Sequence, residues 1–372
     1  MKEIPELRVI DILKENRIDY AATLPCDRIK ALLPLIEKNL KTIPLTREEN
    51  GVGICAGLYL GGKRPIMVIQ STGIGNMINA LESLNLTYGI PLPVLASWRG
   101  VHKEAIEAQW QFGKKLPMVL DAAGISCTII ESKDKLDDID AAIKDSFDNA
   151  HPHIVLMSPA IWEGSSCENP VPCEITPRLS QIEFRSEIRK PELTRYDAIR
   201  TLVSVAGDDI IVSNLGIPSK ELHDIKDRGL NFYMTGSMGL VSSIGLGLAL
   251  SQERHVYVID GDASILMNPN ALASIGGYSP GNLTIVAIDN AACGSTGNQM
   301  TCTNGQIDLE LLAKANGISD TQKAHTCEEL KEALKSRSTF IHVIVKPVNA
   351  MCREIPFSAK EIRERFMKAL GK

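Results

Sequence analysis

The chain has 372 residues, a formal net charge of −5, 23% charged residues and 5% aromatic residues. Its length is enough for two domains of ordinary size, each with its own core. The balanced, slightly acidic composition excludes a nucleic-acid-binding protein, a basic membrane-surface protein and a disordered chain. We therefore expect small molecules and other protein chains as partners, with no nucleic acid and no membrane.

Residues 1–18 are charged and amphipathic, which is not the pattern of a signal peptide. No run of about 18 apolar residues, the length needed to span a bilayer, follows them. The nine cysteines are an odd number, with neither a CxxC pair nor a cysteine–histidine cluster at zinc spacing. We therefore expect free thiols in a reducing compartment and a cytoplasmic protein.

Short apolar runs alternate along the chain with segments of helical periodicity, which predicts an α/β protein with parallel sheets. Residues 160–193 are rich in proline, serine and charge and have no clear period. This change predicts a first domain at 1–162, a linker at 163–192 and a second domain at 193–372. The expected strands are 65–70, 91–97, 127–131, 153–158, 209–213, 255–260, 283–289 and 340–345.

Residues 255–290 read as one strand–helix–strand unit, with a turn GDAS after the first strand and Asn290 after the second. Ligands of open α/β sheets bind at the carboxyl ends of strands, so Asp262 in the turn and Asn290 are expected at the same edge. Carboxylate and amide oxygens suit Mg²⁺. An ordinary βα turn with a capping asparagine explains the same two residues, and the pair alone leaves both interpretations open.

The segments GDASILMN and AIDNAACG resemble the Gly-Asp-Gly to Asn-Asn signature of thiamine diphosphate enzymes. The resemblance implies thiamine diphosphate and Mg²⁺ as cofactors. It also implies that Asp262, Asn290 and the backbone carbonyl of Ala292 are the metal ligands. Two positions depart from the pattern, because Ala263 replaces a glycine and Asp289 replaces an asparagine.

Further segments are similar to the parts of these enzymes that bind the cofactor. In YMTGSMGLVSSIGLGLAL the resemblance places the carbonyl of Gly236 against the aminopyrimidine and the side chain of Met238 under the cofactor. Taken by itself, this segment is better explained as the glycine-rich start of a buried helix. In VSNLGIPSKEL, backbone amides at a helix start can hold the diphosphate, although an ordinary helix cap by Ser219 explains that segment as well. Ala263 is compatible with the site if its φ is negative. The implied cofactor-binding residues are Asn214, Gly216, Gly236, Ser237, Met238, Gly261, Ala263 and Ser264.

The segment TREENGVGICAGLYLGG resembles the helix on which these enzymes carry their catalytic glutamate, and the spacing to Gly57 assigns that role to Glu48 rather than Glu49. A carboxyl group beside the pyrimidine N1′ shifts the ring to its imino tautomer, so that the exocyclic nitrogen can accept a proton. The helix dipole by itself favours an acid at either position.

Residues 69–100 extend the match, and the whole arrangement resembles the sulfopyruvate decarboxylases and the related phosphonopyruvate decarboxylases, with their alpha and beta subunits fused and no middle domain. The resemblance implies a pyrimidine-binding and a diphosphate-binding domain. It also implies non-oxidative decarboxylation of 3-sulfopyruvate to sulfoacetaldehyde and CO₂, a step of coenzyme M biosynthesis in methanogens. Phosphonopyruvate is the alternative substrate.

Two other classes stay open at this point. A non-catalytic thiamine diphosphate-binding protein would account for Ala263. A nucleotide-dependent oxidoreductase would account for the glycine runs, although both approaches to GxGxxG lack the third glycine, at Ile78 and Leu250.

A doubly anionic substrate calls for fixed positive charge or amide donors near the site. The candidates are Arg99, His102, Lys103, Gln109 and Ser295, of which the first three also suit a solvated loop of mixed charge. Because Glu48 and the metal ligands lie in different halves, the resemblance implies a homo-oligomer, a dimer or higher, with the cofactor at the subunit interface.

Overall fold

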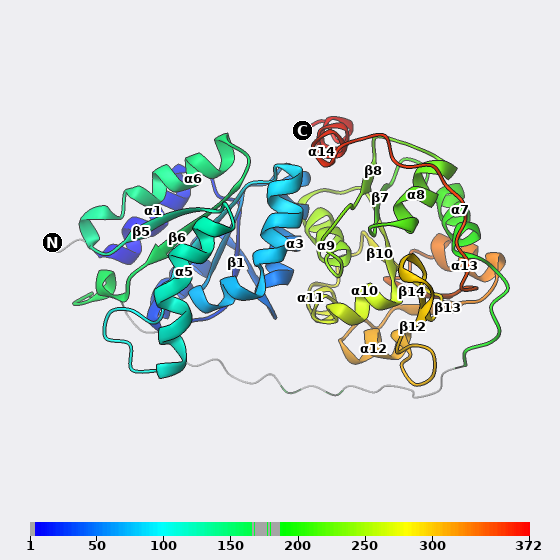
Figure 1. Cartoon of the computed structure of the whole chain (residues 1–372), viewed down its shortest axis with the longest axis horizontal. Coiled ribbons are helices and arrows are strands. Elements are labelled where there is room, and N and C mark those ends of the chain that lie inside the picture. The colour runs from blue at the N-terminus through cyan, green and yellow to red at the C-terminus, as the bar shows by residue number, and fades with distance from the viewer. Residues whose placement is uncertain (1–3, 166, 168–176, 178, 180–186) are drawn as a thin grey trace. The chain divides into compact units, whose positions relative to one another are not determined.

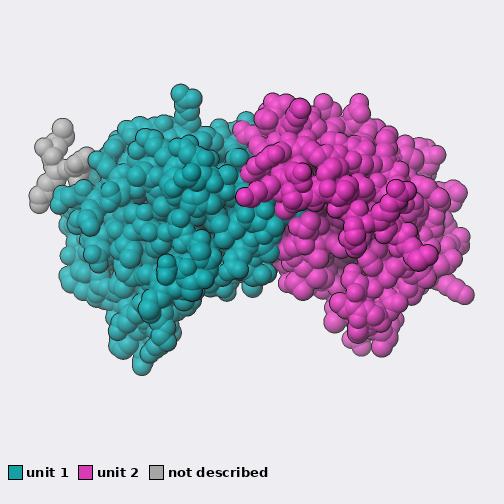
Figure 2. Space-filling view, turned by 45° about the horizontal axis from the view of Figure 1, so that its top comes forward, with its two compact units in different colours: residues 1–59, 63–178 teal, residues 60–62, 179–372 magenta. Residues whose placement is uncertain are grey.

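The structure is a computed structural model and describes residues 4–165, 167, 177, 179 and 187–372. The chain divides into two compact units, residues 1–59 with 63–178 and residues 60–62 with 179–372 (Figure 2). Most of the predicted linker at 163–192 lies outside the described residues. The domain limits at 162 and 193 stay predictions.

The first unit contains a six-stranded sheet of order β2-β1-β3-β4-β6-β5 in which every neighbouring pair is parallel (Figure 1). Its interior strands are buried on both faces, which explains why their sequences are continuous apolar runs rather than alternating ones. The strands are β1 (Tyr20–Thr23), β2 (Lys41–Pro44), β3 (Pro65–Gln70), β4 (Leu92–Ser97), β5 (Ser126–Ile130) and β6 (Pro152–Met157).

Helices follow most of these strands and cover the sheet. Three of them, α1, α2 and α6, bury their apolar stripes with strand residues in one core cluster that includes Ile12, Ile36, Ile143 and Val155. The α-helices are α1 (Pro5–Glu15), α2 (Leu32–Asn39), α3 (Glu48–Leu60), α4 (Ile78–Ala80), α5 (Trp110–Ala122) and α6 (Asp138–Asp148). The shorter turns are η1 (Asp27–Ile29), η2 (Ser71–Asn76), the π-helical η3 (Leu81–Leu86), η4 (Glu107–Gln109), η5 (Lys133–Lys135) and η6 (Pro159–Trp162).

The second unit repeats the design with a parallel sheet of order β13-β14-β10-β9-β7-β8 and a separate antiparallel pair, β11 with β12 (Figure 1). The sheet strands are β7 (Ile210–Ser213), β8 (Asn231–Tyr233), β9 (Val256–Gly261), β10 (Leu283–Asp289), β13 (Thr321–Ala324) and β14 (Phe340–Ile344), and the pair is β11 (Ala292–Cys293) and β12 (Gln299–Met300). The neighbouring order β10-β9-β7 brings the carboxyl ends of three strands to one edge.

The helices of this unit are set by their caps and apolar stripes. Capping boxes at Thr194, Thr326 and Ser358 begin three of them. The helix α9 is buried over nearly its whole length, as expected for a helix that is apolar all round. The helices are α7 (Arg195–Ala206), α8 (Ile217–Ile225), α9 (Val241–Ser251), α10 (Asp262–Met267), α11 (Asn270–Tyr278), α12 (Leu309–Ala315), α13 (Cys327–Lys335) and α14 (Ala359–Ala369), with η7 (Gly294–Thr296) between β11 and β12.

Two further observations bear on expectations from the sequence. Within the described ranges no helix is long and apolar enough to cross a membrane. Eight of the cysteines fall among the described residues, and all eight are free thiols.

The contact of α9 with the sheet depends on a glycine. A Cβ atom on Gly245 would lie 2.2 Å from Cγ2 of Val258 in β9. We expect Gly245→Ala to lower the free energy of unfolding by about 1–3 kcal/mol, because either the helix or the strand must shift. Gly277→Ala in α11 is the matched control, since nothing lies within 4 Å of its added Cβ, and it should be neutral or stabilising. Urea unfolding followed by circular dichroism measures both. Equal midpoints for the two variants would contradict this account.

Candidate cofactor site

The carboxyl end of β9 delivers a buried aspartate. The strand runs directly into α10, whose first residue is Asp262, and the side chain is only 3% exposed. Its Oδ2 accepts a hydrogen bond from the hydroxyl of Thr301, and the hydroxyl of Thr303 lies 3.2 Å from the same oxygen. Burial, and after it the nearby Asp289 carboxylate, raise the pKa of Asp262 to about 6. Asp262 is therefore a buried carboxylate oxygen donor of the kind that suits a hard cation.

The end of β10 delivers the second predicted metal ligand. Asn290 is buried directly after the strand, and its Oδ1 accepts a hydrogen bond from the amide of Ala292 at 3.3 Å. Between them Ala291 has a φ of 53°, a left-handed conformation that is uncommon for alanine. This turn directs the chain into the β11–β12 pair. Asp262 and Asn290 therefore lie at the carboxyl ends of adjacent strands, as the sequence predicted for them.

Ala263 does not disturb this arrangement. It lies in the first turn of α10, and its φ is outside the left-handed region. The condition that the sequence set for an alanine at this position is therefore met. Ser264, one residue further on, is buried, and its Oγ accepts a hydrogen bond from the amide of Gly239 at 3.1 Å. This hydroxyl is thus used to join α10 to the turn before α9.

That turn contains the residues expected at the pyrimidine end of the cofactor. Ser237 and Gly239 both have positive φ values, 57° and 91°, and Met238 between them is half-buried. A Cβ on Gly239 would lie 3.0 Å from Cβ of Asn268. The side chain of Asn268 is buried, and neither its amide nitrogen nor its oxygen has a partner in the described chain. Unpaired buried polar atoms beside a tight turn are what a site for a polar ligand provides.

The loop after β7 supplies the predicted diphosphate segment. Asn214 is buried there, and Gly216 begins α8 with a φ of 78°, which favours glycine. A Cβ on Gly216 would lie 3.4 Å from Oγ of Ser295, so the structure brings this substrate candidate beside the diphosphate segment. The amide of Asn214 donates to Asp260 Oδ1 at 3.3 Å.

Asp260 is a site residue that the sequence reading missed. Its carboxylate is 2% exposed and accepts hydrogen bonds from Ser242 Oγ at 2.6 Å and from the amide of Gly261 at 2.9 Å, besides the one from Asn214. Burial raises its pKa. Asp260 therefore ties together the ends of β7 and β9 and the start of α9. Its place two residues before Asp262 was the one available signal.

In the first unit, the structure distinguishes the two candidate glutamates. Glu48 is 8% exposed, and its Oε2 accepts a hydrogen bond from the Asn76 amide at 3.0 Å. A Cβ on Gly73 would lie 2.1 Å from Glu48 Oε1, so the glycine leaves room for this carboxyl group. Glu49 instead pairs with Arg47 at 3.2 Å and is half-buried. No sequence motif marks Asn76 as a partner of Glu48.

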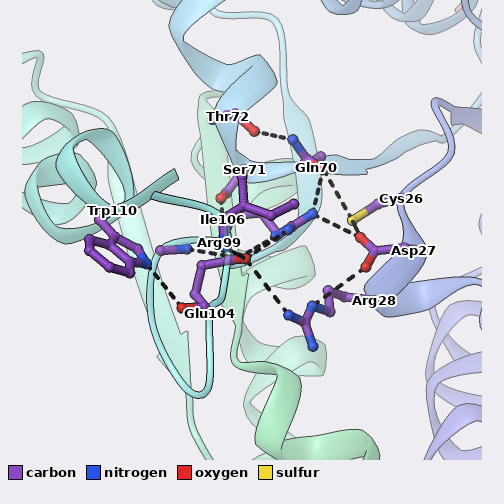
Figure 3. A network of polar contacts seen from close by, with 11 residues as sticks. Cys26, Asp27, Arg28, Gln70, Ser71, Thr72, Arg99, Glu104, Ile106 and Trp110 are labelled. Atoms are coloured by element: carbon purple, nitrogen blue, oxygen red, sulfur yellow. Dashed lines mark hydrogen bonds and ion pairs between the residues drawn. The ribbon is translucent and has the colours of Figure 1, made fainter. Parts of the chain in front are cut away.

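Arg99 is buried and is the centre of a polar network at the carboxyl ends of β1, β3 and β4 (Figure 3). Its guanidinium donates to both oxygens of Glu104 at 2.6 and 3.0 Å, to Asp27 at 2.8 Å and to Gln70 at 3.1 Å. Arg28 lies 3.6 Å from Asp27 and 3.7 Å from Glu104. Two arginines and two carboxylates thus alternate in a closed set. This geometry favours a role for Arg99 in holding its own loop, and the substrate role stays a prediction.

The other predicted substrate residues are placed as follows. His102 and Lys103 both pair with Glu163, at 2.8 and 2.6 Å, in an exposed cluster. Gln109 keeps a buried side-chain oxygen for which the described chain offers no partner. Ser295 belongs to the second unit. Arg99, His102 and Lys103 therefore lie in one loop, and each already has a carboxylate partner within the first unit.

Comparisons with known proteins agree with this geometry. The N-terminal TPP binding domain of thiamine pyrophosphate enzymes matches residues 7–122, and the C-terminal TPP binding domain matches residues 221–343. Benzoylformate decarboxylase from Polynucleobacter necessarius has the same fold, with a TM-score of 0.73 and 13% identity over 94% of this chain and 99% of its own. The fold and the site therefore define a thiamine pyrophosphate enzyme, and thiamine pyrophosphate is thiamine diphosphate under its other name.

Curated relatives from three organisms narrow the class. Sulfopyruvate decarboxylase from Methanosarcina acetivorans is 54% identical over 98% of this chain and 97% of its own. The beta and alpha subunits of sulfopyruvate decarboxylase from Methanocaldococcus jannaschii, which are separate chains, are 48% and 46% identical over 47% and 32% of this chain and 96% and 72% of their own. Phosphonopyruvate decarboxylase from Streptomyces viridochromogenes is 30% identical over 89% of this chain and 85% of its own. The chain belongs to the sulfopyruvate decarboxylase family, and the predicted α/β fold with two parallel-sheet domains is confirmed.

The Arg99 network predicts a dependence of stability on pH. The hydrogen bond from Arg99 holds the pKa of Glu104 at about 2, below its ordinary value of 4.5. The stabilisation is therefore complete above about pH 4.5 and is lost as the pH falls toward 2. We expect Glu104→Gln to lower the free energy of unfolding at pH 7 by about 3 kcal/mol, because it removes the negative charge that pairs with the buried Arg99 guanidinium.

Urea unfolding at a series of pH values measures this effect. The difference between wild type and Glu104→Gln should narrow between pH 4.5 and the acid limit of the folded state. Glu107→Gln, at an exposed position of the same loop, should follow the wild type at every pH. A constant difference down to pH 3 would show that the charge of Glu104 is not the cause.

Proposed function

We propose that this chain catalyses the non-oxidative decarboxylation of 3-sulfopyruvate to sulfoacetaldehyde and CO₂ with thiamine diphosphate and Mg²⁺. The observation that carries the proposal is the match to a sulfopyruvate decarboxylase along nearly the whole chain. The buried Glu48 in one unit and the buried Asp262 and Asn290 in the other support it. These side chains are the acid and the metal ligands that the resemblance requires.

Asp262, Asn290 and the carbonyl of Ala292 would hold Mg²⁺. They are hard oxygen donors of the kind that Mg²⁺ prefers, and Asp262 and Asn290 are both buried at the ends of adjacent strands. The diphosphate would lie against the backbone at Gly216 and at the start of α10, formed by Gly261, Ala263 and Ser264. Asn214 is the last member of this diphosphate-binding group, and its side-chain amide is held by a hydrogen bond to Asp260.

The pyrimidine end would lie against the turn of Gly236, Ser237 and Met238. When bound, thiamine diphosphate supplies a carbanion that adds to the ketone of a 2-oxo acid and accepts the electrons released as CO₂ leaves. Glu48 would share a proton with the pyrimidine N1′. Asn76 holds the Glu48 carboxylate through Oε2, which leaves Oε1 for that exchange. Asn76 is therefore a positioning residue for this proton.

Phosphonopyruvate is the second candidate substrate, since both acids carry a tetrahedral anionic head and differ mainly in one charge near neutral pH. The higher identity to a sulfopyruvate decarboxylase than to a phosphonopyruvate decarboxylase favours the sulfonate. A non-catalytic role is disfavoured because the conformation of Ala263 fits the site. The match to thiamine pyrophosphate enzyme models in both halves argues against the oxidoreductase.

We also propose that the active form is a homo-oligomer, a dimer or higher, with the cofactor at the subunit interface. Glu48 and the metal ligands belong to different units, and in Methanocaldococcus jannaschii the enzyme has separate alpha and beta subunits. Sedimentation of the cofactor-loaded chain tests this proposal, which an active monomer would contradict.

Release of CO₂ from 3-sulfopyruvate tests the function directly. We expect turnover only when thiamine diphosphate and Mg²⁺ are both present, with a higher kcat/KM for 3-sulfopyruvate than for phosphonopyruvate. Faster turnover of phosphonopyruvate would reassign the substrate. Turnover without either cofactor would overturn the assignment of the reaction.

The glutamate assignment has a built-in control one residue away. Glu48→Gln removes the acid and should lower kcat by about 10²- to 10⁴-fold, the range for a general acid–base group, while cofactor still binds. Glu49→Gln removes a carboxylate that pairs with Arg47 and should change kcat less than twofold. The opposite order of the two effects would transfer the role to Glu49.

A further inference from the structure

Asp289 is the position at which this chain carries an acid and the thiamine diphosphate enzyme signature has an asparagine. The carboxylate is 4% exposed at the end of β10. Its Oδ1 accepts hydrogen bonds from the amide of Ala291 at 2.9 Å and from Thr303 Oγ1 at 2.7 Å. Its Oδ2 lies 2.9 Å from Nε2 of His342. The acid is therefore engaged on both oxygens by the chain itself.

The bond to Ala291 fixes the turn between two proposed metal ligands. Ala291 lies between Asn290 and Ala292 and has a left-handed φ of 53°. A residue with a Cβ holds such a conformation only where its surroundings impose it. Asp289 Oδ1 supplies that constraint by accepting the Ala291 amide. The direction of the Asn290 side chain and of the Ala292 carbonyl therefore depends on Asp289.

The bond to Thr303 connects Asp289 to the third proposed ligand. The Thr303 hydroxyl lies 2.7 Å from Asp289 Oδ1 and 3.2 Å from Asp262 Oδ2, and it is 3.0 Å from the hydroxyl of Thr301. One threonine thus bridges the two carboxylates. It also fastens the far end of the 291–303 loop, which carries β11 and β12, to the ends of β9 and β10.

His342, on the neighbouring strand of the sheet, contacts the Asp289 carboxylate. It lies on β14, in register with Ala287 of β10, and is 0% exposed. Its Nε2 faces Asp289, and its Nδ1 lies 3.5 Å from Oδ1 of Asp308, so a carboxylate oxygen faces each ring nitrogen. Asp308 in turn pairs with Lys323. The imidazole therefore has a fixed orientation and contacts Asp289 without contributing to the predicted ligand set.

We infer that Asp289 and His342 form a positioning pair that sets the geometry of the Mg²⁺ ligands through Ala291 and Thr303. The inference rests on the proposed function, because it takes Asp262, Asn290 and the Ala292 carbonyl as the ligands. Removing a group that hydrogen-bonds to a metal ligand and orients it typically weakens metal binding by about 10- to 100-fold. The pair also explains the departure from asparagine, since an aspartate at 289 can accept the hydrogen bond that His342 donates.

The test measures cofactor binding rather than turnover. The metal-stripped full-length chain is titrated with thiamine diphosphate by calorimetry at a series of Mg²⁺ concentrations, which gives the concentration for half-maximal binding. We expect Asp289→Ala and His342→Leu each to raise this half-maximal Mg²⁺ concentration by about 10- to 100-fold. Asp289→Asn keeps an oxygen acceptor and should raise it less than about fivefold. His342→Leu in the Asp289→Asn background should add little, because no carboxylate is left unpaired.

His255→Leu is the matched control. His255 is also a buried histidine of this unit, bonded to Thr284 Oγ1 at 2.9 Å at the amino end of β9. We expect it to lower the thermal midpoint but to leave the half-maximal Mg²⁺ concentration within twofold of wild type. If His342→Leu raises the half-maximal Mg²⁺ concentration no more than His255→Leu does, the pair has only a structural role and the inference is overturned.

A second measurement needs no variant. Hydrogen exchange of the metal-free wild type should show the Ala291 amide protected, because Asp289 accepts it before any metal binds; free exchange of that amide would also overturn the inference. Failure of the proposed function looks different. If wild type binds thiamine diphosphate equally well without Mg²⁺, the metal-ligand assignment itself fails, whatever the variants do.

Discussion

The second unit depends on keeping three carboxylates, those of Asp260, Asp262 and Asp289, buried at the ends of two adjacent strands. A buried carboxylate is stable only where hydrogen bonds or opposite charge replace its water. The groups that replace water around each of the three carboxylates differ. Asp260 receives amide and hydroxyl donors, Asp289 faces His342, and Asp262 has two hydroxyls and a raised pKa. Of the three, only Asp262 is a proposed Mg²⁺ ligand, so a bound cation would stabilise it directly.

The fold was largely accessible from the sequence because most strands of a parallel sheet are continuous apolar runs. All eight expected strands are present, whereas the short antiparallel pair β11 and β12 and four strands of the parallel sheets, β1, β2, β8 and β13, were missed. Each of these four has only three or four residues, and β13, with the sequence TQKA, and β2, with KTIP, are polar enough to read as loops. Strands of that length are determined by their neighbours in the sheet rather than by their own pattern.

The residues of the candidate site likewise fall into two groups, those that a local motif indicates and those that only the folded structure brings together. Asp262, Asn290 and Glu48 stand in local motifs, and a resemblance could single them out. Asn76, Thr301 and Thr303 act on those residues from 28 to 41 positions away, through contacts that exist only after folding. The charge pattern around Arg99 left two interpretations open, cations for an anionic substrate and a solvated loop of mixed charge. Folding places carboxylates against those cations, which no local pattern could show.

Each unit has its own complete parallel sheet and its own buried helices. Joining two such units in one chain therefore requires no change of packing in either of them. It requires only a connecting segment. In Methanocaldococcus jannaschii the alpha and beta subunits are separate chains. In this chain every ribosome that completes one unit also completes the other, and covalent linkage fixes their supply at one to one.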